Sequence, residues 1–511
     1  MRHVNLARSA GLLLHPTSLP GPFGIGDLGP EARRWVDFVA ASGCGWWQVL
    51  PLGPTGYRDS PYQSFSSFAG NPLLVSPEGL VADGLLAPED LAAAPTAFAS
   101  GDAIDYGAVI AWKLPLLDKA AARMAAGHML AAEFAAFRQR EAGWIADFAL
   151  FMALKEAHGG GPWIDWPAPL RDAEPEALRA ARASRATATH RHAFRQWAFA
   201  RQWAALRGHA HARGVSILGD APIFVAHDSA DVWAHRGLFQ LAAAGRPTVV
   251  AGVPPDYFAK TGQLWGNPLY RWEAHAAEDY AWWIARMKAT LRLVDRVRLD
   301  HFRGFAAAWE VPALAKTAET GRWVAGPGEE FLAALERGLG GLPIVAEDLG
   351  EITADVEALR RKFGLPGMRI LQFGFTGPDN PFLPHRHVPD TVVYTGTHDN
   401  DTVAGWFATA PAAEKEFLER YRGPSTDSVP WDLVRMSWAS VAALAVTTPQ
   451  DLLELGPEAR MNFPGREEGN WTWRLPPAFL DADAPLLAPK LRDLGVTFER
   501  TVRTAATPAR A

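Results

Sequence analysis

Short apolar runs separated by longer amphipathic stretches are the main pattern along this chain. Seven of these runs have the length and composition of buried strands, and turn-forming residues bound them. They lie at residues 12–15, 47–52, 215–218, 297–299, 343–346, 368–373 and 391–394. We expect an eighth strand to end near residues 460–465. Runs with so few polar positions are typical of a parallel sheet that is covered on both faces.

Amphipathic helices are predicted between several of these runs. The first begins at Pro30, places Trp35 and Phe38 on one face, and ends at Gly43. Three more each lead into the next apolar run, at residues 278–294, 329–337 and 352–363. This alternation of strand and helix predicts an α/β fold, a (β/α)8 TIM barrel with large, mostly helical insertions.

Two long stretches interrupt the alternation. Residues 73–210 are alanine-rich, with helical spacing at 143–158 and no convincing strand, so we predict a helical insertion subdomain between strands 2 and 3. Residues 226–272 are rich in glycine, proline and aromatic residues, and we predict an aromatic loop over the barrel mouth. This loop is either a lid or a structural loop packed by its own aromatics. The whole chain, 1–511, is expected to form one barrel domain.

Composition narrows the class of protein. Apolar residues make up 48% and charged residues 21%, as in an ordinary globular protein with a large core. The net charge is −6, whereas nucleic-acid-binding proteins usually carry an excess of basic residues, so we expect no nucleic-acid partner. One cysteine, Cys44, excludes an internal disulfide. The polar start of the chain and the lack of a long apolar run lead us to expect a cytoplasmic protein with no membrane partner.

Acidic side chains follow three of the predicted strands. Asp300 ends the run 297–299, Glu347 follows 343–346, and Asp399 follows the strand at 391–394. In a parallel barrel every strand points its carboxyl end at the same face, where the active site is built. A single acid at a strand end is often just a helix cap, but three in series favour a shared site.

Three acids at one face suit the cleavage of a glycosidic bond, which needs a nucleophile and an acid/base. Asp300 fits the nucleophile, because Arg298 lies on the same side of the strand and would orient its carboxylate and lower its pKa. Glu347 follows an apolar run and fits the acid, which needs a raised pKa. Asp399 would hold sugar hydroxyls and stabilise positive charge, with His398 beside it.

With these residues in these positions, the chain resembles the amylomaltases, the 4-α-glucanotransferases of glycoside hydrolase family 77 in the α-amylase superfamily. The resemblance covers about residues 11–474 and depends on seven ordered motifs. They are SPYQS at 60–64 with GNP at 70–72, GDAPIFV at 219–225, PPDYFAKTGQLW at 254–265, RLDHF at 298–302, EDLG at 347–350, THDND at 397–401 and RMNFPG at 460–465.

The resemblance implies a role for each matching residue. Asp300 would be the nucleophile, Glu347 the acid/base and Asp399 the transition-state stabiliser. A further set of residues would bind the glucan. They are Asp220, Arg298, His398, Tyr62, Tyr257, Phe258, Trp265 and Asn462. The expected partners are α-1,4-glucans such as maltodextrins, starch or glycogen chains, with glucose or maltose as acceptors.

The resemblance also implies the reaction, in which an α-1,4-glucan segment moves from a donor to the 4-hydroxyl of an acceptor sugar. Two alternatives stay open. A retaining α-glucan hydrolase would use the same three acids, and a non-catalytic glucan-binding protein would be expected to have lost one of them.

No cofactor or metal is expected. Residues 24–29 (GIGDLG) match a dinucleotide-binding pattern, but their distance from the preceding strand is wrong for that site. The acids lie singly on separate strands, and no pair of histidines or cysteines has the spacing of a metal site.

Overall fold

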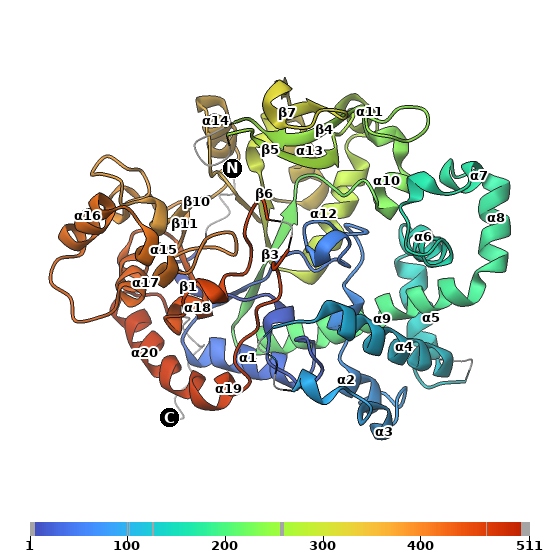
Figure 1. The fold of residues 1–511 in the computed structure, drawn as a ribbon, viewed down its shortest axis with the longest axis horizontal. Helices are drawn as coiled ribbons and strands as arrows, with labels where there is room; N and C mark the ends of the chain where they lie inside the picture. Colours follow the sequence, from blue (N-terminus) through green and yellow to red (C-terminus); the bar gives the residue numbers. More distant parts are fainter. Residues whose placement is uncertain are drawn as a thin grey trace, which may run out of the picture.

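The computed structural model describes residues 6–99, 101, 103–124, 127–255, 260–466 and 468–501. Eight parallel strands form one sheet in the order β10-β11-β12-β1-β2-β3-β6-β9 (Figure 1). Their bounds are β1 (Ser9–Leu13), β2 (Trp46–Gln48), β3 (Ser216–Pro222), β6 (Arg296–Asp300), β9 (Ile344–Ala346), β10 (Gly367–Ile370), β11 (Thr391–Tyr394) and β12 (Leu444–Thr447). The Ala346 amide donates to the Pro366 carbonyl at 2.8 Å, which brings β9 beside β10. The fold is therefore a nearly closed (β/α)8 barrel, as predicted.

The eighth strand is not where the sequence pattern placed it. It is β12, whereas residues 460–465 lie beyond it in a loop that reaches the site. The run 441–447 is as apolar as the other strands, but it is short and follows directly on α17 (Val429–Ala439). The sixth strand also ends earlier than expected, at Ile370, because the chain then turns into a short 3-10 helix.

Helices cover the outside of the barrel. Those nearest the sheet include α1 (Pro30–Ala41), α12 (Ala281–Leu293), α13 (Gly328–Leu339), α14 (Ala354–Lys362), α17 and α20 (Ala484–Thr497). The other helices after β3 are α10 (Ala230–Ala234), α11 (Trp272–Ala277), α15 (Val403–Thr409), α16 (Ala412–Arg422), α18 (Pro449–Leu452) and α19 (Phe479–Ala482). No helix in the described part of the chain is long and apolar enough to cross a membrane.

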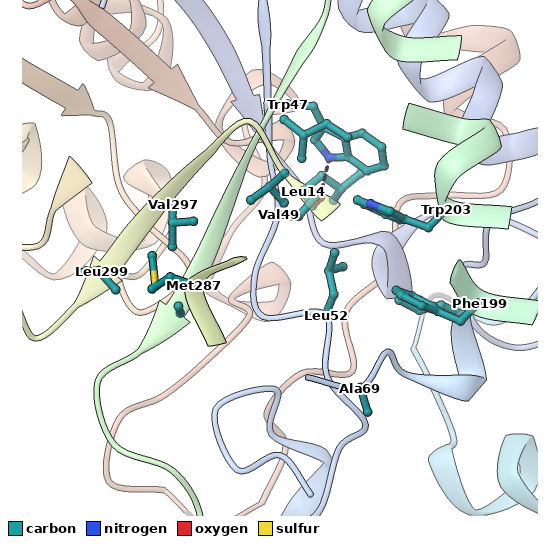
Figure 2. Packing of buried hydrophobic residues seen from close by; sticks show 14 of the residues in the cluster. Leu14, Trp47, Val49, Leu52, Ala69, Phe199, Trp203, Met287, Val297 and Leu299 are labelled. Atoms are coloured by element: carbon teal, nitrogen blue, oxygen red, sulfur yellow. Dashed lines mark hydrogen bonds between the residues drawn. The ribbon is translucent and has the colours of Figure 1, made fainter. Parts of the chain in front are cut away.

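Helices also fill the chain between β2 and β3, on the right of Figure 1. They are α2 (Pro77–Ala82), α3 (Pro88–Leu91), α4 (Tyr106–Arg123), α5 (Ala131–Arg140), α6 (Ile145–Ala157), α7 (Ala168–Arg171), α8 (Pro175–Ser184) and α9 (Ala186–Ala212). The middle of α9 packs on the barrel: Trp203 lies 6.2 Å from Trp47 of β2, and Phe199 stacks on Trp203 (Figure 2). The indole of Trp47 donates to the Leu14 carbonyl at 2.7 Å, which ties β2 to the end of β1.

Two glutamines of α9 hold the loop after β2 in place. Gln196 makes paired hydrogen bonds with the amide and carbonyl of Gly70, at 2.7 and 2.8 Å. Gln202 does the same with Ser76, at 2.6 and 3.0 Å. All four residues are largely buried, so these bonds satisfy backbone groups that water does not reach. They fix the chain just beyond the segment that carries Tyr62.

A second sheet stands above the barrel in Figure 1 and was not predicted. It is antiparallel, with strand order β5-β4-β7-β8. The strands are β4 (Val249–Val253), β5 (Gln263–Pro268), β7 (Ala307–Pro312) and β8 (Arg322–Ala325). Residues 226–272 were predicted to be a loop, but they contain β4 and β5, which pair with each other, and β4 also pairs with β7 from beyond β6. Such long-range pairing leaves no local signature in glycine- and proline-rich sequence.

Candidate active site

The parallel strands bring the predicted acids to one face of the barrel. In the register of β3 and β6, Asp220 lies opposite Arg298, and Asp300 is the last residue of β6. On the other side of β6, β9 ends directly before Glu347. Asp399 lies in the turn after β11. The carboxyl ends of these strands thus place four acids around the barrel mouth.

Arg298 links two of these acids. Its Nη1 donates to Asp220 Oδ2 at 2.7 Å, and its Nη2 lies 2.8 Å from Asp300 Oδ1. The side chains of Arg298 and Asp220 are almost fully buried. Burial opposes the charge on Arg298, but Asp220 and Asp300 outweigh it and hold the pKa of the guanidinium well above its usual value. The charged Arg298 guanidinium therefore holds the Asp300 carboxylate with one of its nitrogens while the other is bound to Asp220.

The pKa of Asp300 differs from the expectation. Arg298 does act to lower it, as predicted, but burial of the carboxyl is the larger effect and raises the pKa to about 6. The nearby charges of Asp220 and Asp399 add to the increase. Asp300 is consequently ionised at neutral pH by only a small margin.

Glu347 is held by two backbone amides. The N–H of His301 donates to Oε2 at 2.7 Å, and the N–H of Leu349 donates to Oε1 at 2.8 Å. His301 has a φ of +52°, and this left-handed conformation directly follows Asp300. Burial raises the pKa of Glu347 to about 8, the charge of Asp300 adds to the rise, and the two N–H groups oppose it. Glu347 is thus largely protonated at neutral pH, as a general acid requires.

The neighbouring acid, Asp348, belongs to the scaffold. Its Oδ1 accepts from the Met368 amide at 2.6 Å, and its Oδ2 lies 3.3 Å from Arg360 and 3.5 Å from Arg369. These contacts tie the end of β9 to β10, across the open edge of the sheet. The geometry therefore supports Glu347 rather than Asp348 as the group that faces the site.

Asp399 is held in its ionised form. Asn462 Nδ2 donates to Oδ1 at 2.6 Å, and His398 Nε2 lies 3.3 Å from Oδ2. Burial acts to raise the pKa of Asp399, but His398, Asn462 and Arg298 hold it well below the usual range. The carboxylate still keeps 43% of its surface exposed, enough for a ligand to reach it.

Arg460 was missed as a site residue, although it begins the RMNFPG motif. Its Nη2 donates to the Asp399 carbonyl at 2.6 Å, and its Nε donates to the Asn462 carbonyl at 2.8 Å. Asn462 itself donates from its backbone to the His398 carbonyl at 3.0 Å. Through these hydrogen bonds Arg460 links the loop after β12 to the turn after β11. Its position in a matched motif was a usable signal.

Tyr62 joins both halves of the site. Its hydroxyl donates to Asp220 Oδ2 at 2.8 Å and lies 2.8 Å from His398 Nε2. The ring stacks on His398, with centroids 5.3 Å apart and planes at 15°. Burial, reinforced by Asp220, holds the pKa of Tyr62 well above its usual value, so the hydroxyl stays a donor. Trp471 packs on both rings, at 5.8 and 6.0 Å, and was also missed by the sequence analysis.

The aromatic segment above the barrel contributes Trp265. Its ring meets the His301 imidazole edge-on at 4.8 Å, and Phe224 lies 6.4 Å from both rings. Tyr257 and Phe258 lie outside the described residues. Among the residues that are described, no group of three or more acids, histidines or cysteines is arranged to hold a metal ion.

Comparison with known proteins agrees with this geometry. A family model described as 4-alpha-glucanotransferase matches residues 14–480. A 4-alpha-glucanotransferase of Thermus thermophilus is 53% identical over 97% of this chain and 100% of its own length. One from Synechocystis is 48% identical over 92% of this chain and 94% of its own. The structure of an amylomaltase from Streptococcus agalactiae in complex with acarbose superposes with a TM-score of 0.93 at 36% identity, covering 97% of this chain and 100% of the other. The chain therefore belongs to the 4-alpha-glucanotransferase family.

Proposed function

We propose that Asp300 is the nucleophile and Glu347 the acid/base of a retaining glucan transfer. The observation that carries this proposal is the contrast between two neighbouring carboxyls. Asp300 contacts the Arg298 guanidinium, whereas Glu347 accepts from two backbone amides and has a pKa raised to about 8. Around neutral pH one group is ionised and the other protonated, which is the state that a retaining mechanism needs at its start.

The first step breaks the glycosidic bond. The Asp300 carboxylate attacks the anomeric carbon, and Glu347 gives its proton to the departing glycosidic oxygen. In the second step the 4-hydroxyl of an acceptor sugar attacks the same carbon, its proton passes to Glu347, and the bond to Asp300 breaks. Two inversions restore the α configuration, so no net acid or base is consumed.

The remaining polar residues would bind the sugar that reacts. Asp399 keeps an exposed, ionised carboxylate that can accept from hydroxyls and stabilise positive charge on the ring. Asp220, Arg298, His398, Tyr62 and Asn462 form one connected hydrogen-bond network around it. A preorganised network of this kind favours a transition state whose charge it matches.

The donor would be an α-1,4-glucan, and the acceptor glucose or a second glucan. The S. agalactiae amylomaltase was solved in complex with acarbose, which supports α-glucans as substrates of this chain. Trp265 beside His301, and the predicted glucan-binding residues Tyr257 and Phe258, would stack on sugar rings. We assign residues 73–210 to a helical subdomain and 226–272 to a cover over the mouth. The cytoplasmic location expected from the sequence stays a prediction.

The test is to incubate the enzyme with maltotriose and resolve the products. Transfer yields glucose and maltopentaose while the number of reducing ends stays constant. Hydrolysis yields glucose and maltose while reducing ends increase. Added isotope-labelled glucose should appear at the reducing end of longer products. Asp300→Asn serves as the inactive control, and a steady rise in reducing ends with no longer products would refute transfer.

A further inference from the structure

A small cavity is lined by His398 but by neither Tyr62 nor Asp399. Its volume is about 20 Å³. Three neighbouring strands, β11, β12 and β1, each supply a lining residue from beyond their carboxyl ends. These residues are His398 after β11, Gln450 in α18 after β12, and His15 after β1.

Each of the three residues carries a buried polar atom without a partner in the described part of the chain. The atoms are His15 Nδ1, Gln450 Oε1 and His398 Nδ1. The residues are 5%, 9% and 4% exposed, so bulk water does not reach them. Buried polar atoms are rarely left unpaired, because their desolvation is then uncompensated.

Other polar groups around the cavity are already paired. Ser18 donates to the Trp473 carbonyl at 2.8 Å, Thr397 donates to Asn400 at 2.8 Å, and Asp451 accepts from Thr395 at 2.6 Å. The three residues that carry the unpaired atoms therefore line one cavity, and no other described lining residue has a buried side-chain polar atom without a partner.

The hydrogen-bond network fixes what two of the unpaired atoms need. The Tyr62 hydroxyl donates to Asp220, which favours His398 Nε2 as the donor toward Tyr62 and Asp399. In the neutral imidazole, His398 Nδ1 is then an acceptor. Gln450 Nε2 donates to the Ala459 carbonyl at 3.3 Å, which leaves Oε1 as a second acceptor. The third atom, His15 Nδ1, can donate.

We propose that the cavity is a binding site for one ordered water, which donates to His398 Nδ1 and Gln450 Oε1 and accepts from His15 Nδ1. Two acceptors and one donor match the two protons and one of the lone pairs of a water. The volume also suffices, since one water needs about 10–15 Å³ and about three polar partners.

This water makes His15 and Gln450 positioning residues. By donating to Nδ1 it favours the imidazole tautomer with its proton on Nε2, the nitrogen that faces Tyr62, Asp399 and the bound sugar. The role is the same as that of a carboxylate or carbonyl behind a catalytic histidine, where the partner of one nitrogen decides the task of the other. The water site is independent of the proposed function, whereas its effect on the rate rests on it.

Two observations test the site without any activity measurement. A high-resolution crystal structure should show a single water within hydrogen-bond distance of all three atoms. Nitrogen NMR of the histidine side chains should show His398 with a proton on Nε2 and a bare Nδ1, assigned by its loss in His398→Gln. A cavity without water, or His398 with its proton on Nδ1, would overturn the proposal while leaving the glucan transfer intact.

A matched pair of variants tests the positioning role. In His15→Asn the amide nitrogen can occupy the place of Nδ1 and still donate, whereas His15→Leu has a similar branched shape without a donor. Gln450→Met keeps the length of the side chain and removes Oε1. For His15→Leu and Gln450→Met we expect kcat/KM on maltotriose to fall about tenfold, the loss of one buried hydrogen bond, and His15→Asn to stay within about threefold of wild type.

The same variants should change the NMR signature of His398. His15→Leu and Gln450→Met are expected to give a mixture of the two tautomers, and His15→Asn the wild-type signal. The positioning role would be refuted if His15→Asn and His15→Leu lost the same rate and the same Tm while the His398 signal stayed unchanged. That result would show that His15 is only a packing residue.

Discussion

The protonation state of Glu347 should make both the activity and the stability of the enzyme depend on pH. Transfer requires Asp300 ionised and Glu347 protonated. Their pKa values, about 6 and about 8, allow that state between these two limits. We therefore expect kcat/KM to rise through about pH 6, peak near pH 7 and fall through about pH 8, where the two limbs describe the coupled pair.

Stability should follow the same group with a definite sign. Burial raises the pKa of Glu347 from 4.5 to about 8, so the folded state holds this proton more tightly than the unfolded chain. The contribution of this group to the free energy of unfolding is then fully present below pH 4.5. It is lost as the pH rises toward 8. A pKa difference of about 3.5 corresponds to about 5 kcal/mol. Relaxation and water entry around a buried charge reduce such values, and we expect a loss of about 2 kcal/mol between pH 5 and pH 8.

Glu347→Gln removes both effects at once. Transfer should be abolished, yet the unfolding free energy of the variant relative to wild type should rise by about 2 kcal/mol from pH 5 to pH 8. The glutamine amide must face one of the two backbone N–H groups, a cost that does not change with pH and cancels in the comparison. The assay is urea unfolding followed by tryptophan fluorescence, with the exposed Glu419→Gln as control.

The reasoning fails if kcat/KM shows no basic limb up to pH 10. It fails equally if the stability difference between Glu347→Gln and wild type is the same at pH 5 and pH 8. If a variant of Glu347 keeps some activity and still shows the same basic limb, that limb belongs to the titration of another group.

Four further outcomes are expected. Asp300→Asn should lose on the order of 10⁴-fold in rate, and mass spectrometry with a slow fluorinated donor should label Asp300 and no other carboxylate. A crystal structure should place the Asp300 and Glu347 carboxyls about 5–5.5 Å apart, whereas a gap of about 6.5–9.5 Å would indicate inversion. Replacing Tyr257 and Phe258 by serine should weaken acceptor stacking by roughly 1 kcal/mol per ring, so the ratio of hydrolysis to transfer should rise; a stable double variant with an unchanged ratio would contradict this. Exhaustive dialysis against EDTA should leave activity unchanged, and a loss that calcium restores would show that a metal is needed.

Much of the fold follows from local sequence alone. Apolar runs of the right length predicted seven barrel strands, because each strand of a covered parallel sheet must be apolar on both faces. The acids at their ends could be found for the same reason, since a charge directly after such a run can only lie at the barrel mouth. Asp300 and Glu347 lie at such positions, at the ends of two adjacent strands.

Other features depend on contacts that no local pattern encodes. In the second sheet β4 pairs with β7, which follows β6 in the sequence, so this pairing joins segments on both sides of a barrel strand. The loop at 460–465 was assigned to the last strand because it carries site residues, but Arg460 and Asn462 reach the site through hydrogen bonds to the turn after β11. His15 and Gln450 have no motif chemistry and acquire their position only when β12 closes beside β1.

The pKa of Asp300 shows most clearly where sequence reasoning ends. The neighbour was predicted correctly, since Arg298 lies two residues away on the same face and contacts the carboxylate. The net direction was wrong, because the depth of burial outweighs the guanidinium. The same burial acts on Glu347, which lies on the adjacent strand without a direct contact to Arg298, and there the increase is larger. The two carboxyls share one buried environment, and the placement of a single guanidinium against one of them is what separates the nucleophile from the acid.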